Sequence, residues 1–88
     1  MKKHKKRRND LYLKCLGDAV RNRRVDLLFT QDMLSTRCDV HRTYVTELEN
    51  GFRNLSLLTL VKVSVALSLP LSQLIKETEL LIALGQPA

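Results

Sequence analysis

Apolar residues recur along the chain at intervals of three or four residues, which is the period of an α-helix. The first such stretch follows Asn9 and Asp10, which are good N-cap residues, and it includes Leu16, Val20 and Leu27. The alternating pattern typical of strands is almost absent. The pattern therefore predicts an all-α fold whose first helix begins near residue 10.

Capping signals divide the rest of the chain into shorter helices. Thr30 can cap a second helix, and a tight break follows at Asp39 and Val40, where aspartate tolerates left-handed backbone geometry. A third helix is expected over about 41–50, with Gly51 as its C-terminal cap.

Two further helices complete a predicted five-helix domain. Ser56 can cap a fourth helix that runs to Leu67, and Pro70 is placed where a fifth can begin. Along this fifth helix one stripe is formed by Leu71, Leu74, Ile75 and Thr78.

The fourth helix is apolar nearly all round and should be buried nearly all round. We expect Leu58 and Val65 to be covered either by a second subunit or by the apolar segment 80–84. Our hypothesis is a homodimer whose interface draws on helix five and this segment. The predicted interface residues are Leu58, Val65, Leu71, Thr78, Leu81 and Ile82.

Charge is distributed unevenly along the 88 residues, which carry 15 basic and 9 acidic side chains and a formal net charge of +6. The first eight residues hold six of the basic groups and no acid, so we expect a disordered arm that binds an anion, nucleic acid first. A solubility tail is the alternative. The arm's predicted phosphate contacts are Lys2, Lys3, Lys5, Lys6, Arg7 and Arg8.

These observations predict one domain over 11–79, with the arm at 1–10 and an extension at 80–88. No stretch is typical of a secretory signal or a membrane span, and Cys15 and Cys38 are expected to be reduced and buried, so a cytoplasmic protein is predicted.

Candidate enzymatic and metal sites are sparse. Cys38 and His41 have ligand-like spacing, but only Cys15 and His4 remain to complete a zinc site, so we predict no metal and no cofactor. The sequence also lacks a nucleophile–base pair and a glycine-rich phosphate loop, which argues against an enzyme.

Residues 31–50 predict two helices joined by a break short enough to make them cross steeply. The corner between them is filled by Leu34, Cys38, Val40, Val45 and Leu48. The residues left facing outward are His41, Arg42, Thr43, Thr46 and Glu47. A helix that exposes hydrogen-bonding side chains in this way can enter the major groove and contact base edges, so double-stranded DNA is the predicted partner.

Five segments carry a family resemblance, which extends from Leu16 to about Glu77. They are Leu16-Gly17-x-x-Val20-Arg21-x-x-Arg24, Phe29-Thr30-Gln31-x-x-Leu34, Arg42-Thr43-Tyr44-Val45-Thr46-x-Leu48-Glu49-x-Gly51, Arg53-Asn54-Leu55-Ser56 and Leu60-x-Lys62-x-x-x-Ala66-Leu67. In this order and spacing the chain resembles the Cro/repressor-type helix-turn-helix regulators, or XRE family. Within this family, the chain looks most like the controller proteins of restriction-modification systems, which bind DNA as homodimers. The runs that carry this likeness are Arg42-Thr43-Tyr44-Val45-Thr46 and Arg53-Asn54-Leu55-Ser56.

The resemblance implies that Arg42, Thr43 and Thr46 contact bases. It also implies an ion pair between Arg24 and Glu49. Predicted contacts to the DNA backbone from the body of the domain are Thr30, Gln31, Tyr44, Arg53, Asn54 and Ser56.

Several positions keep alternatives open. Tyr44 can contact phosphate or pack against the fourth helix, and Glu47 can accept from a cytosine amine or have a surface role. Ser35, Asp39 and His41 depart from the family's preferred alanine, glycine and small capping residue, and the last two suggest a slightly altered turn. A protonated His41 would add positive charge beside DNA.

The sequence thus predicts a homodimeric regulator of transcription that binds a pseudo-palindromic operator. With the resemblance, we expect a nucleoid-associated protein of prokaryotic or phage type. The alternative is an antitoxin or adaptor of the same fold whose main contact is a partner protein held by the apolar surface of the fourth helix and the arm.

Overall fold

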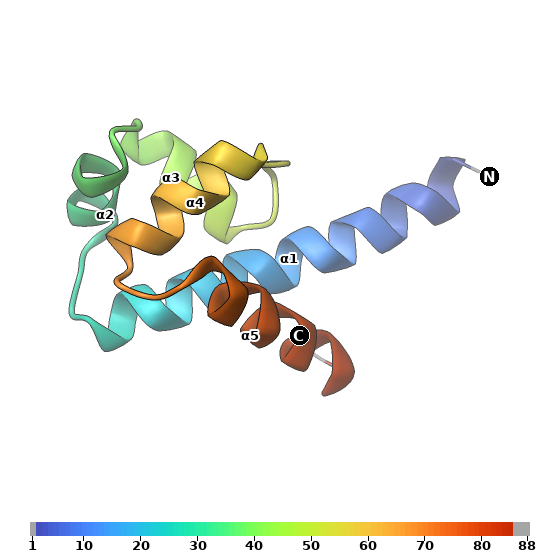
Figure 1. Ribbon diagram of the computed structural model, residues 1–88. Coiled ribbons are helices and arrows are strands. Elements are labelled where there is room, and N and C mark those ends of the chain that lie inside the picture. Colours follow the sequence, from blue (N-terminus) through green and yellow to red (C-terminus); the bar gives the residue numbers. More distant parts are fainter. Residues whose placement is uncertain (1, 86–88) are drawn as a thin grey trace.

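The computed structural model describes the backbone of residues 2–85 and the side chains of residues 10–85. Within these residues the fold consists of helices and contains no strand, which confirms the all-α, five-helix prediction. The helices are α1 (Lys2–Asp26), α2 (Gln31–Cys38), α3 (Arg42–Glu49), α4 (Leu57–Ala66) and α5 (Leu71–Ala83). Figure 1 shows α2, α3 and α4 gathered beside the C-terminal half of α1, whose N-terminal end projects away from the other helices.

One aliphatic core joins all five helices. Leu34, Leu67 and Leu74 are fully buried, and Cys15 and Cys38 are buried as predicted. The remaining large core residues are Leu16, Val20, Val45, Leu48, Leu55 and Val63. Because aromatic side chains are scarce, close aliphatic packing between helices accounts for most of the buried apolar area.

The caps predicted at Thr30 and Ser56 are confirmed, whereas Asn9 and Asp10, predicted to cap the first helix, lie inside α1. Thr30 Oγ1 accepts a hydrogen bond from the Met33 amide at 3.0 Å, and Ser56 Oγ accepts one from the Thr59 amide at 3.2 Å. Asp39 ends α2 in the left-handed conformation, with φ of 59°. The aspartate therefore adopts the backbone conformation for which glycine is favoured, and the turn between α2 and α3 stays short.

The start of the first helix differs from the prediction. A disordered arm was expected over 1–10, whereas α1 begins at Lys2 and continues without a break through the basic run. Lysine and arginine have high helix propensity, and extending a helix that is already packed costs much less than nucleating a new one.

α5 packs along α1 and leaves the outer face of α4 uncovered. Leu58 and Val65 are 74% and 69% exposed, so segment 80–84 does not cover them. The interface prediction for Thr78 is wrong, because Thr78 is fully buried within its own chain and its Oγ1 donates to the Leu74 carbonyl at 2.9 Å. Leu71 and Leu81 are half-buried against the core, and Ile82 is half-buried.

Within the part of the chain that the structure describes, no single helix is both long and apolar enough to cross a membrane. Only α4 and α5 taken together reach that length and hydropathy, and they are bent by 97° at the break between them.

The free energy of unfolding is expected to depend on pH through the buried Cys38 thiol. Burial raises its pKa, and the charge of Lys62 opposes part of this shift. The unfolded chain then loses the thiol proton at lower pH than the folded chain, so the contribution of Cys38 is fully present below roughly pH 8.5 and is lost as the pH rises. We expect urea denaturation to show a larger loss of stability between pH 7 and alkaline pH for the wild type than for Cys38→Ala. Equal losses would contradict this expectation.

Candidate nucleic-acid interface

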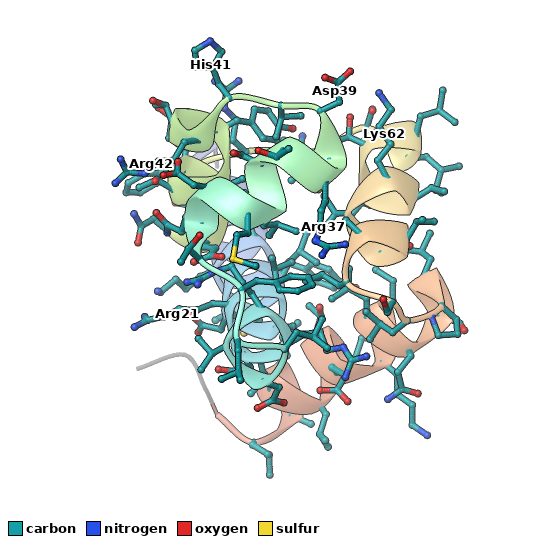
Figure 2. All side chains as sticks on the ribbon, turned by 90° about the vertical axis from the view of Figure 1, so that its left-hand side faces the viewer. Arg21, Arg37, Asp39, His41, Arg42 and Lys62 are labelled. Carbon is teal, nitrogen blue, oxygen red and sulfur yellow. The ribbon has the colours of Figure 1, made fainter. Side chains whose placement is uncertain are left out.

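The candidate interface is built around the turn between α2 and α3. His41 precedes α3 in an extended conformation and makes no side-chain capping hydrogen bond. Figure 2 shows His41 at the tip of the turn and Arg42 pointing away from the body of the domain. Because Val45 and Leu48 are buried against the core, the opposite side of α3 faces outward.

The five outward-facing residues differ in their environments. His41, Arg42 and Thr43 are exposed, and the Arg42 side chain is 65% accessible with its Nε 3.8 Å from the Asp32 carboxylate. Thr46 is half-buried, and its hydroxyl donates to Gln31 Oε1 at 2.9 Å. Glu47 is also half-buried. The structure therefore brings the predicted base-contacting residues onto one helix face, with the three N-terminal ones most accessible.

Glu49 is the centre of a network beneath this face. Its carboxylate accepts from Arg24 Nε at 2.5 Å, from Arg24 Nη2 at 3.0 Å and from Gln31 Nε2 at 3.1 Å. Arg24 also donates to the Phe29 carbonyl at 2.7 Å. The hydrogen bond to Glu49 raises the pKa of the Arg24 guanidinium in spite of partial burial. The ion pair implied by the resemblance is thus present, and it joins α1 to α3 and to the start of α2.

Gln31 is held by this network at the N-terminus of α2. One Nε2 hydrogen is donated to Glu49 and the amide oxygen accepts from Thr46. A primary amide has a second N–H donor, so a phosphate contact from Gln31 is compatible with both bonds.

Arg53 lies in the loop after α3 and has two partners. Its Nε donates to Glu47 Oε1 at 2.8 Å, and its guanidinium lies 4.7 Å from the centroid of the Tyr44 ring. Tyr44 is half-buried and packs against the core. Of the two alternatives for Tyr44, core packing is therefore present in this structure. No pattern in the sequence indicates the contact between Glu47 and Arg53, which lie six residues apart across the end of a helix.

Other predicted backbone contacts lie around the same surface. The hydroxyls of Thr30 and Ser56 cap α2 and α4, and Asn54 is exposed. The side chains of the predicted contacts in the basic run, residues 2–8, lie outside those that the structure describes.

Three arginines outside the predicted site have distinct environments. Arg21 is exposed and points to the same side as Arg42 in Figure 2. Arg23 instead donates to the Leu67 and Ser68 carbonyls at 2.9 and 3.1 Å. Arg37 lies over the Phe29 ring at 4.4 Å. Arg21 is therefore a further candidate for contact with a bound polyanion.

Among the described side chains, no three histidine, cysteine, aspartate or glutamate residues are grouped so that they could hold a metal ion. Cys38 points into the core, whereas His41 is exposed, so the ligand-like spacing of these two residues does not bring them into one site.

Comparison with known proteins agrees with this geometry. Residues 20–74 match the helix-turn-helix family. The chain is 38% identical over 60 residues to control protein C.MunI from a Mycoplasma species, covering 68% of this chain and 78% of that protein.

Solved structures of two controller proteins superpose on this chain. The restriction-modification controller protein C.AhdI from Aeromonas hydrophila superposes with a TM-score of 0.69 at 31% identity, covering 70% of this chain and 94% of that one. The C.Esp1396I controller, solved as a tetramer with its 35 base-pair operator, superposes with a TM-score of 0.68 at 25% identity, covering 77% and 95%. The chain belongs to the XRE-type helix-turn-helix family of transcriptional regulators.

Proposed function

We propose that this protein binds duplex DNA in a sequence-specific way as a homodimer and regulates transcription from a pseudo-palindromic operator. The observation that carries the proposal is the exposed N-terminal part of α3, held in place from below by the network of Glu49, Arg24 and Gln31. A helix presented in this way fits the major groove. Because the proposed partner is DNA, we place the protein in the cytoplasm, in a regulatory rather than a catalytic role.

Base recognition is assigned to the exposed start of α3. The Arg42 guanidinium suits bidentate bonding to guanine, and the Thr43 methyl and hydroxyl suit thymine or a phosphate. Thr46 is the deeper contact and needs to keep or exchange its bond to Gln31. Arg53, Asn54 and the α2 terminus border this helix and are proposed to contact phosphates.

The uncovered outer face of α4 supports the homodimer. Leu57, Leu58, Val61 and Val65 are 66%, 74%, 40% and 69% exposed, an apolar face that a second copy would remove from water. A two-fold dimer would place the recognition helices about one DNA turn apart, with half-sites centred roughly 10 bp apart.

In sedimentation at micromolar concentration we expect a dimer for the wild type and a monomer for Leu58→Asp. The matched control is Leu28→Asp, at an 86% exposed leucine outside α4, which should remain dimeric.

DNA-binding measurements can test the separate roles proposed here, sequence recognition by α3 and sequence-independent affinity from the basic run 2–8. Selection from a random duplex pool should first enrich a two-fold-symmetric site. Arg42→Ala should then weaken operator binding by roughly 10- to 100-fold and leave binding to random duplexes nearly unchanged. Deletion of residues 2–8 should weaken binding to every sequence and flatten the dependence of affinity on salt. If the two changes act alike, the proposed roles are wrong.

The uncovered α4 face also suits the alternative, an antitoxin or adaptor that binds a partner protein. That alternative is favoured if no motif is enriched from the random pool and a co-encoded protein copurifies with the wild type but not with Leu58→Asp.

A further inference from the structure

Glu47 places a carboxylate on the outward face of the recognition helix. It lies one turn after Thr43, and 39% of its side chain is accessible to solvent. A negative charge at this position is repelled by DNA phosphates, so it should weaken binding unless a specific contact compensates.

In the free protein that charge is paired with Arg53. A hydrogen bond of 2.8 Å joins Arg53 Nε to Glu47 Oε1. The same guanidinium lies over the Tyr44 ring, at 4.7 Å from its centroid, and that ring is itself packed against the core. Arg53 is therefore held between a carboxylate and an aromatic ring, and its charge is neutralised.

This ion pair is suited to exchange when DNA binds. The Arg53 side chain is 47% accessible, and half-exposed pairs are screened by water and contribute little stability. A phosphate can replace the carboxylate as a partner of Arg53 at small cost, provided that Glu47 then finds a donor. In the major groove the base-edge donors are the exocyclic amino groups of cytosine and adenine.

We propose that Glu47 is a specificity-determining residue that acts through Arg53. Glu47 holds Arg53 over Tyr44 in the free protein, and it releases Arg53 to the DNA backbone only where a cytosine or adenine amino group takes its place. On other sequences, either Arg53 contacts a phosphate and leaves the Glu47 carboxylate unpaired, or Arg53 stays paired with Glu47 and makes no phosphate contact. Both outcomes weaken binding. This inference rests on the proposed DNA-binding function and deepens it.

The dependence of affinity on salt measures the release of Arg53. Each phosphate neutralised adds about 0.9 to the slope of log affinity against log salt concentration. For Glu47→Gln we expect affinity for random duplexes to rise about tenfold and this slope to steepen by about one contact. The preference for the selected operator should fall by at least fivefold. In a new selection, one position of each half-site should lose its preference for cytosine or adenine over guanine or thymine.

Two controls separate this exchange from a general change of charge. Glu79→Gln removes the same charge from an exposed position on α5 and should leave the slope nearly unchanged. In an Arg53→Ala background, Glu47→Gln should no longer steepen the slope. Glu47→Ala provides a second variant, and thermal melting verifies that all the variants fold.

The outcomes distinguish a failure of the proposed exchange from a failure of the proposed DNA-binding function. If the wild type binds duplexes but Glu47→Gln leaves the slope and the base preference unchanged, the exchange is refuted and the proposed function stands. An equal effect of Glu79→Gln also refutes it. If the wild type binds no duplex at any salt concentration, the proposed function itself fails.

Discussion

Replacing Glu49 with glutamine is expected to lower the free energy of unfolding by about 3 kcal/mol, since removing one partner of a buried ion pair leaves the other charge uncompensated. The Glu49 side chain is 3% accessible and that of Arg24 is 12% accessible. The glutamine can accept only through its oxygen, and its NH2 group would face either Arg24 or Gln31, which both donate. Urea denaturation at neutral pH measures the loss.

A half-buried but more accessible pair on α1 is the matched control. Lys14 and Asp18 are 3.3 Å apart and 37% and 25% accessible, so Asp18→Asn should change stability by less than about 1 kcal/mol. The double variant Arg24→Met/Glu49→Leu should recover part of the loss, because it leaves no buried charge. Equal losses for Asp18→Asn and Glu49→Gln would show that burial does not determine the effect.

The same measurement has a defined pH dependence from Arg24. The pKa of Arg24 is higher in the folded than in the unfolded protein. Below the pKa of the unfolded state the guanidinium is charged in both states, and its contribution to the free energy of unfolding is fully present. That contribution is lost only as the pH rises through the pKa of the folded state. The loss caused by Glu49→Gln should therefore not diminish between neutral and mildly alkaline pH.

Local signals were enough to predict most of the fold. A cap depends on a few neighbouring residues, so Thr30, Ser56 and the left-handed Asp39 could be identified from sequence alone. The contact between Arg24 and Glu49 spans 25 residues and came from a family resemblance rather than from periodicity.

Predictions that depended on tertiary packing were less successful. The stripe on the fifth helix was correct, but α1 occupies it, so Thr78 is buried and not available to a partner. The first helix starts at Lys2 because charge repulsion alone does not end a helix. Glu47 and Arg53 meet only because the loop after α3 turns back, and no short-range pattern predicts that.

Gly17→Ala is expected to destabilise the fold by about 2 kcal/mol, although alanine is the better helix former. Gly17 lies inside α1, where its replacement by alanine would ordinarily gain about 1 kcal/mol. A Cβ at this position would lie 2.5 Å from the Leu48 carbonyl oxygen and 2.6 Å from that of Glu49. Both are backbone atoms, so α1 and α3 would have to move apart, and overpacking of this kind costs about 1–3 kcal/mol or more.

Asn22→Ala is the control, because Asn22 is exposed on the same helix and its replacement should stabilise the protein slightly. Opposite signs for the two alanine substitutions in urea denaturation would show that close approach of α3, rather than helix propensity, selects glycine at residue 17. If both substitutions stabilise, the contact is looser than the structure indicates. Since α1 carries Arg24 and α3 carries Glu49, a separation of these helices would also weaken their ion pair. We therefore expect Gly17→Ala and Glu49→Gln to be less than additive when combined.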